Sequence, residues 1–172
     1  MTDTLGYAYI YRKTVRLTPG KPEMTLEHSL RNTGKKPIVS SVYEHNFYML
    51  DNQPAGPGYT IFFPFDVRPR ANLRGMAEAQ GKQFTYLKEL QTGQSVCSQL
   101  EGFENKAADY DIRVENSIAK TGVRQTADRP MSKLMFWSIR TTVCPEPYID
   151  LNIEPGQETS WTIKYEFYTL PR

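Results

Sequence analysis

Alternation of apolar and polar residues, interrupted at short intervals by turn-forming residues, is the feature that most limits how this chain can fold. The clearest example is segment 161–170, where large apolar residues occupy every second position: Trp161, Ile163, Tyr165 and Phe167. A period of two buries one face of a β-strand and leaves the other in water. Segment 7–17 shows the same period, and many short segments of this kind predict an antiparallel β-sandwich or an open barrel.

Ten segments bounded by Gly, Pro, Asn or Asp are expected to be strands. They are 7–17, 24–30, 38–50, 59–63, 83–88, 95–103, 110–116, 122–125, 133–144 and 161–170. The first three are expected to pair as a meander. Residues 64–80 lack clear periodicity and predict an irregular crossing, with at most a short helical turn at 76–79. Neither a repeat nor a linker divides the 172 residues, so we expect one domain over 1–172.

Charge and hydropathy exclude several classes of function. The chain has 21 Lys plus Arg against 19 Asp plus Glu, with no block of like charges, so a nucleic-acid partner is not expected. No apolar stretch reaches the roughly twenty residues of a membrane span, and residues 1–6 do not read as a signal peptide. As presented, the chain predicts a cytoplasmic protein, and a secreted or periplasmic location stays open if a signal lies upstream. Cys97 and Cys144 can form a disulfide or remain thiols.

Two segments carry candidate catalytic groups. His45 lies within an apolar, aromatic segment, and Glu146 stands between Pro145 and Pro147 at the expected exit of an apolar strand. An imidazole and a carboxylate held in this way can work as an acid and base pair. The structural alternatives are a half-buried histidine bonded to backbone and an exposed turn glutamate between strand-ending prolines.

Further residues suit a sugar ligand. Trp137 offers a flat surface for the C–H face of a pyranose, although a core tryptophan of a sandwich would look the same. Arg68, Arg70 and Arg74 would suit a sugar phosphate if they converge, and are otherwise a solvated loop.

These segments resemble the galactose mutarotase-like superfamily, which includes aldose 1-epimerases and hexose-6-phosphate mutarotases. The resemblance rests on three short motifs: Tyr43-Glu44-His45-Asn46-Phe47-Tyr48-Met49-Leu50, Val143-Cys144-Pro145-Glu146-Pro147, and Ile153-Glu154-Pro155-Gly156 before the last strand. It implies an antiparallel β-sandwich of the supersandwich type.

The resemblance also implies a function, the interconversion of sugar anomers by acid and base ring opening. His45 would be the general acid and Glu146 the general base, placed across a sugar ring, while Asp109, Trp137 and Asn46 would bind the sugar. Asp111 is the alternative to Asp109. The implied partner is a hexose, free or phosphorylated, with no metal and no cofactor.

Members of this family are generally nearly twice as long, so the resemblance places this chain in their C-terminal portion, apparently shortened at the N-terminus. Strands that lose their partners in this way would be covered by self-association, which predicts a homo-oligomer. Two interpretations follow: an aldose 1-epimerase-like enzyme, or a non-catalytic carbohydrate-binding or structural β-sandwich.

Overall fold

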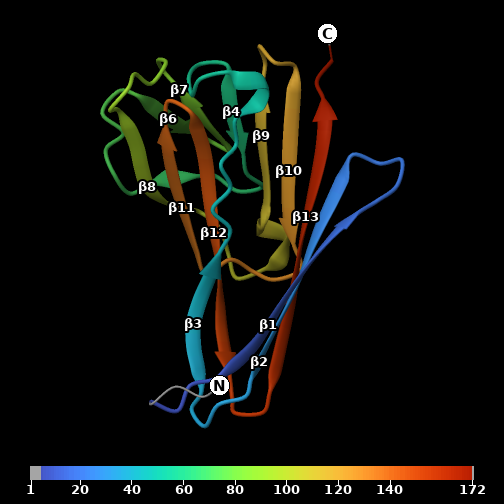
Figure 1. Cartoon of the computed structure of the whole chain (residues 1–172). Helices are drawn as coiled ribbons and strands as arrows, with labels where there is room; N and C mark the ends of the chain where they lie inside the picture. The colour runs from blue at the N-terminus through green and yellow to red at the C-terminus, as the bar shows by residue number, and fades with distance from the viewer. Residues whose placement is uncertain (1–4, 172) are drawn as a thin grey trace.

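Two antiparallel β-sheets packed face to face form the protein, whose computed structural model describes residues 5–171 (Figure 1). The larger sheet contains β1 (Tyr9–Leu17), β2 (Glu23–Asn32), β4 (Tyr59–Phe62), β6 (Ala77–Gln80), β7 (Gln83–Tyr86), β9 (Asp111–Asn116), β10 (Thr121–Ala127) and β13 (Glu158–Thr169). The smaller sheet contains β3 (Ile38–Tyr43), β5 (Arg68–Pro69), β8 (Ser95–Glu101), β11 (Lys133–Ile139) and β12 (Thr142–Ile153). Two short 3₁₀ turns, η1 (Leu50–Asn52) and η2 (Ala107–Asp109), complete the elements of the described chain. The predicted all-β sandwich is confirmed.

The strand order is β1-β2-β13-β10-β9-β4-β7-β6 in the larger sheet and β3-β12-β11-β8-β5 in the smaller one. Side chains from both inner faces fill the space between the sheets. Phe84 of β7 and Phe136 of β11 meet there with ring centroids 4.3 Å apart, and both are fully buried. Burying a side chain of this size contributes about 1.5–3 kcal/mol. Among residues 5–171, no helix has the length and apolarity that a membrane crossing requires.

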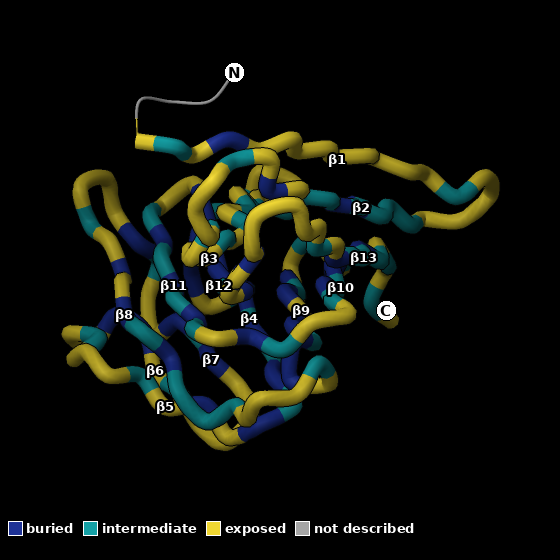
Figure 2. The backbone as a smooth tube through the Cα atoms, turned by 90° about the horizontal axis from the view of Figure 1, so that it is seen from below, coloured by how far each residue is buried: buried dark blue, intermediate teal, exposed yellow. Residues whose placement is uncertain are grey.

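Strand β1 lies at one edge of the larger sheet and is solvent-exposed along its whole length (Figure 2). It pairs with β2 alone, so its other backbone edge is open. The predicted period of two is present in the sequence of β1, but the residues on both faces of the strand are exposed.

Three expectations about the strands were wrong. Residues 76–79 belong largely to β6 rather than to a helical turn, because Gly81 at φ 56° turns the chain and β7 pairs with the segment. The first three strands do not form a meander, since β13 occupies the second edge of β2 and β3 pairs with β12 in the other sheet. Segment 133–144 is not one strand: it turns at Arg140 and Thr141, and β12 begins at Thr142.

Candidate functional site

Two prolines inside β12 explain why the chain beside them leaves the sheet. Val143 exchanges both backbone hydrogen bonds with Tyr48, at 3.1 and 2.9 Å. Alternate residues of a strand present their N–H groups to the same side, so Pro145 and Pro147 face the segment before Tyr48 and have no proton to donate there. Residues 44–47 therefore run beside β12 without ladder bonds.

This geometry corrects two expectations. Segment 38–50 is not a continuous strand, because β3 ends at Tyr43. Glu146 does not follow a strand but lies in the middle of β12, opposite Met135 of β11. The prolines interrupt pairing on one side of β12 but do not end the strand. The N–H groups that face β11 belong to the alternate residues Cys144, Glu146 and Tyr148.

Segment 44–48 keeps a strand-like alternation although it is not a strand. Asn46 and Tyr48 point between the sheets, where the Asn46 amide and the Tyr48 hydroxyl both donate to Gln125 Oε1 at 3.0 Å. The Asn46 side-chain oxygen accepts from the Tyr165 hydroxyl at 2.9 Å. His45 and its stacked neighbour Phe47 point the other way, to the outer face of the smaller sheet.

On that outer face, His45 contacts two side chains of β12. Its Nε2 lies 3.3 Å from Glu146 Oε1, and its Nδ1 lies 3.0 Å from Cys144 Sγ. The His45 side chain is 34% exposed and that of Glu146 only 9%. A nearly buried carboxylate beside a partly exposed imidazole can exchange a proton with a ligand through the imidazole.

Cys144 is the member of this group that sequence reasoning missed. Burial raises the pKa of its thiol, and the charge of Glu146 and a hydrogen bond with that carboxylate raise the pKa further. A hydrogen bond from the Asn46 backbone acts in the opposite direction. The thiol is therefore neutral at physiological pH. Its position two residues before Glu146 on one strand was the available signal, because such residues share a face.

Aromatic side chains surround the three polar groups. Trp137 pairs with Cys144 across β11 and β12, and its ring stands nearly perpendicular to that of His45, with centroids 5.6 Å apart. Phe47 stacks on His45 at 4.4 Å and is 65% exposed. Tyr43 and Tyr148 stack on each other at 4.5 Å at the edge toward β3. The face thus combines flat apolar surface with an imidazole and a carboxylate in contact.

The other predicted site residues make their polar contacts elsewhere. Asp109, in η2, accepts a hydrogen bond from the backbone of Glu104 at 2.6 Å and lies 3.6 Å from Lys106 Nζ. The side-chain amide of Asn46 makes its hydrogen bonds with Gln125 and Tyr165 between the sheets. The structure therefore brings His45, Glu146 and Trp137 together, and does not bond Asp109 or the Asn46 side chain to them.

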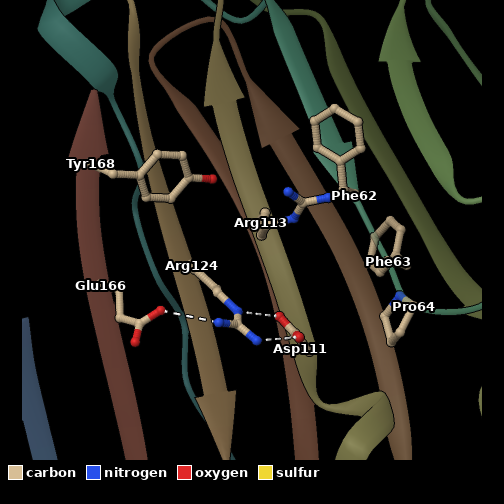
Figure 3. Close-up of a pocket in the computed structure, with 8 residues that line it drawn as sticks. All are labelled: Phe62, Phe63, Pro64, Asp111, Arg113, Arg124, Glu166 and Tyr168. Carbon is tan, nitrogen blue, oxygen red and sulfur yellow. Dashed lines mark hydrogen bonds and ion pairs between the residues drawn. The ribbon is translucent and has the colours of Figure 1, made fainter. Parts of the chain in front are cut away.

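A hollow on the outer face of the larger sheet offers a second group of charged residues (Figure 3). Arg124 donates two hydrogen bonds to Asp111, at 2.8 and 2.7 Å, and a third to Glu166 at 3.2 Å. These contacts raise the pKa of Arg124 and use all three of its side-chain nitrogens as donors. Asp111, the alternative sugar ligand, is thus held by an arginine in the other sheet from His45.

Comparison with known proteins identifies the fold. No protein-family model matches the chain, and no curated protein matches its sequence. Many solved structures superpose on it, including the following three. A protein provisionally described as an aldose 1-epimerase, from Klebsiella pneumoniae, has a TM-score of 0.71 at 13% identity, over 97% of this chain and 48% of that one. A GalM/aldose epimerase homologue from C. elegans has a TM-score of 0.65 at 11% identity, over 99% and 68%. A galactose mutarotase-like protein from Clostridium acetobutylicum has a TM-score of 0.64 at 10% identity, over 95% and 57%.

At these identities the likeness establishes the fold, which is the galactose mutarotase-like sandwich predicted from the sequence. The chain spans about half the length of the first of these structures.

Proposed function

We propose that the outer face of the smaller sheet binds an aldose, and that His45 and Glu146 interconvert its anomers by acid and base catalysis. The observation that carries the proposal is the 3.3 Å contact between His45 Nε2 and the nearly buried carboxylate of Glu146. The fold is consistent with it, since solved proteins named as aldose epimerases or their homologues share the sandwich.

The proposed reaction moves protons only. The Glu146 carboxylate takes the proton of the anomeric hydroxyl while protonated His45 gives a proton to the ring oxygen. The bond between C1 and the ring oxygen breaks, and C1 becomes a carbonyl carbon. After rotation about C1–C2 the protons move back, the ring closes on the other face, and both side chains return to their starting states.

The reaction starts from Glu146 as a carboxylate and His45 as an imidazolium. Their 3.3 Å contact places both groups within reach of one sugar. Both groups lie on one side of the ligand, whereas the sequence-based expectation put them across a sugar ring. An adjacent pair suits the chemistry, because the ring oxygen and the anomeric oxygen are both bonded to C1.

Aromatic residues supply the surface on which a pyranose would lie. Trp137 and Phe47 flank His45 and present flat rings that match the C–H face of a sugar. We assign Asn46 a positioning role, because its amide bonds to Gln125 and Tyr165 hold the segment that carries His45.

A phosphorylated hexose is the alternative substrate to a free aldose, and the position of Arg70 bears on this choice. The backbone N–H of Arg70 donates to the carbonyl of Gln99 on β8. Gln99 lies opposite Met135 of β11, and Met135 lies opposite Glu146 of β12. Arg70 therefore lies in the same row as Glu146 three strands away, at about 14 Å from strand spacing. Its guanidinium is paired with Glu101, so a phosphate would have to displace that carboxylate.

The second candidate function is binding of a carbohydrate without turnover. It is favoured by the openness of the surface, since the side chain of His45 is 34% exposed and Phe47 is 65% exposed. Proximity and orientation supply much of a catalytic effect, and an open surface supplies less of both.

Polarimetry separates the two functions. Freshly dissolved α-glucose and α-galactose, and their 6-phosphates, are followed with wild type, Glu146→Gln and Glu89→Gln. Glu89 is the matched control, because it is also a carboxylate paired with a basic side chain, Arg140, and belongs neither to the His45 group nor to the Arg70 pair. We expect wild type and Glu89→Gln to accelerate mutarotation, and Glu146→Gln to lose roughly 10²–10⁴-fold. Calorimetric binding of the sugar without any acceleration by wild type would contradict the catalytic function and leave the binding function.

A further inference from the structure

Three side chains of different chemistry converge beside Trp137. A ligand atom from each of His45, Cys144 and Glu146 lies within 4.8 Å of the other two. They offer an imidazole nitrogen, a sulfur and a carboxylate oxygen.

The backbone holds these donors in a fixed arrangement. Cys144 and Glu146 are two residues apart on β12, so both point to the outer face, and β11 pairs with β12 along this whole stretch. His45 is held by the segment that follows it, since Asn46 and Tyr48 are anchored to Gln125. The three donors are therefore kept next to one another before any ion binds.

The donor set selects the kind of ion. Sulfur and imidazole favour zinc and related transition or post-transition cations, whereas magnesium and calcium prefer oxygen ligands. Three protein ligands with a fourth position left for water is the arrangement of catalytic zinc sites.

The side chains must turn to enclose an ion, because one imidazole nitrogen bonds it, whereas Nδ1 now faces Cys144 and Nε2 faces Glu146. Tetrahedral zinc, with bonds of about 2.3 Å to sulfur and 2.0–2.1 Å to nitrogen, separates those two atoms by about 3.5 Å. Cys144 Sγ and His45 Nδ1 are 3.0 Å apart, so the imidazole must move outward by about half an ångström. The partly exposed His45 side chain leaves room for this movement.

We propose that His45, Cys144 and Glu146 bind one zinc-type divalent cation, such as Zn²⁺, Co²⁺ or Cd²⁺, with water as the fourth ligand. The cation replaces the thiol proton, which is released to solvent, and bonds to the lone pair of a neutral imidazole. The site does not depend on the proposed sugar chemistry. It excludes that chemistry while occupied, because a coordinated Glu146 carboxylate is not free to take the proton of the anomeric hydroxyl.

Titration of the whole chain with Cd²⁺ tests the proposal, with the thiolate-to-cadmium charge-transfer band in the ultraviolet as readout and no sugar present. Wild type and Cys97→Ser should show a band that saturates at one ion per chain, and Cys144→Ser should lose it. His45→Gln and Glu146→Gln should keep the thiolate band but bind Cd²⁺ at least about tenfold more weakly. Cys144→Ala is the second variant if the serine variant fails to fold, as judged by circular dichroism.

Two results would overturn the proposal. A band that is lost in Cys97→Ser and kept in Cys144→Ser would place the ion on the exposed thiol. Unchanged affinity in His45→Gln and Glu146→Gln would mean that a single thiol binds the ion without a built site. Either result is independent of polarimetry, so failure of the metal site and failure of the sugar reaction can be told apart.

Discussion

Replacing Gln125 by leucine should destabilise the protein and displace His45, although the two residues do not touch. The Gln125 side chain is 1% exposed and has three hydrogen-bond partners: the Asn46 amide and the Tyr48 hydroxyl donate to its oxygen, and its amide donates to the Tyr110 hydroxyl. Burial raises the pKa of both tyrosines well above the usual value, which places this group in a poorly hydrated region.

The magnitude follows from the donors that the substitution leaves without a partner. Leucine keeps most of the volume, so the main cost comes from the stranded Asn46 amide and Tyr48 hydroxyl, at about 1–3 kcal/mol each. We therefore expect a loss of roughly 2–6 kcal/mol. A loss of about 3 kcal/mol corresponds to a fall in Tm of about 6–12 °C for a chain of this size.

Urea unfolding of wild type, Gln125→Leu and Gln80→Leu measures the effect. Gln80 is the matched control, because it is exposed on β6 and the same substitution strands no donor there. If Gln125→Leu costs less than about 1 kcal/mol, the network does not hold segment 44–48 and the positioning role of Asn46 is wrong.

Three further predictions concern titration, thiol reactivity and assembly. Burial lowers the pKa of His28 to about 4, so the unfolded chain binds protons more readily than the folded one between pH 6.5 and 4. Stability should therefore fall by up to about 3 kcal/mol as the pH is lowered through this window, and a His28→Gln variant should lose that part of the slope in urea unfolding at several pH values. Because the pKa of the Cys144 thiol is raised, iodoacetamide should alkylate Cys97 first, as peptide mass spectrometry would show. Alkylation of Cys144 should be faster in the Glu146→Gln variant, and an unchanged rate would contradict the contact between the thiol and that carboxylate. Exposed apolar side chains and the open edge of β1 should drive self-association, and light scattering that gives a monomer at high concentration would contradict this.

The sequence predicted the sandwich because strand formation depends on local patterns. Trp161, Ile163 and Tyr165 are buried in β13 as their period of two requires. The same local reasoning failed where pairing with a distant strand overrode it, as at 76–79, where helix-forming residues pair with β7. It also failed at Thr141, where a turn lies within a run that contains no glycine or proline.

The candidate site shows the same division. The residue types of His45 and Glu146 and their resemblance to a known family could be read from the sequence. The spacing of Cys144 and Glu146 could also place those two on one face. That Cys144 meets His45, and that Asn46 turns inward to Gln125, could not be read, because these contacts join residues about 80 to 100 positions apart.

The sequence by itself determined that the chain is built of β-strands and which face of a strand such as β13 is apolar, since both follow from side-chain alternation along one strand. Only the tertiary structure decided that Pro145 and Pro147 stand next to residues 44–47 and deny them a hydrogen-bond ladder. The physical reason is that a proline's missing N–H affects only the neighbouring strand whose carbonyl group would have accepted that hydrogen bond. Which strand is the neighbour is set by the packing of the whole sheet.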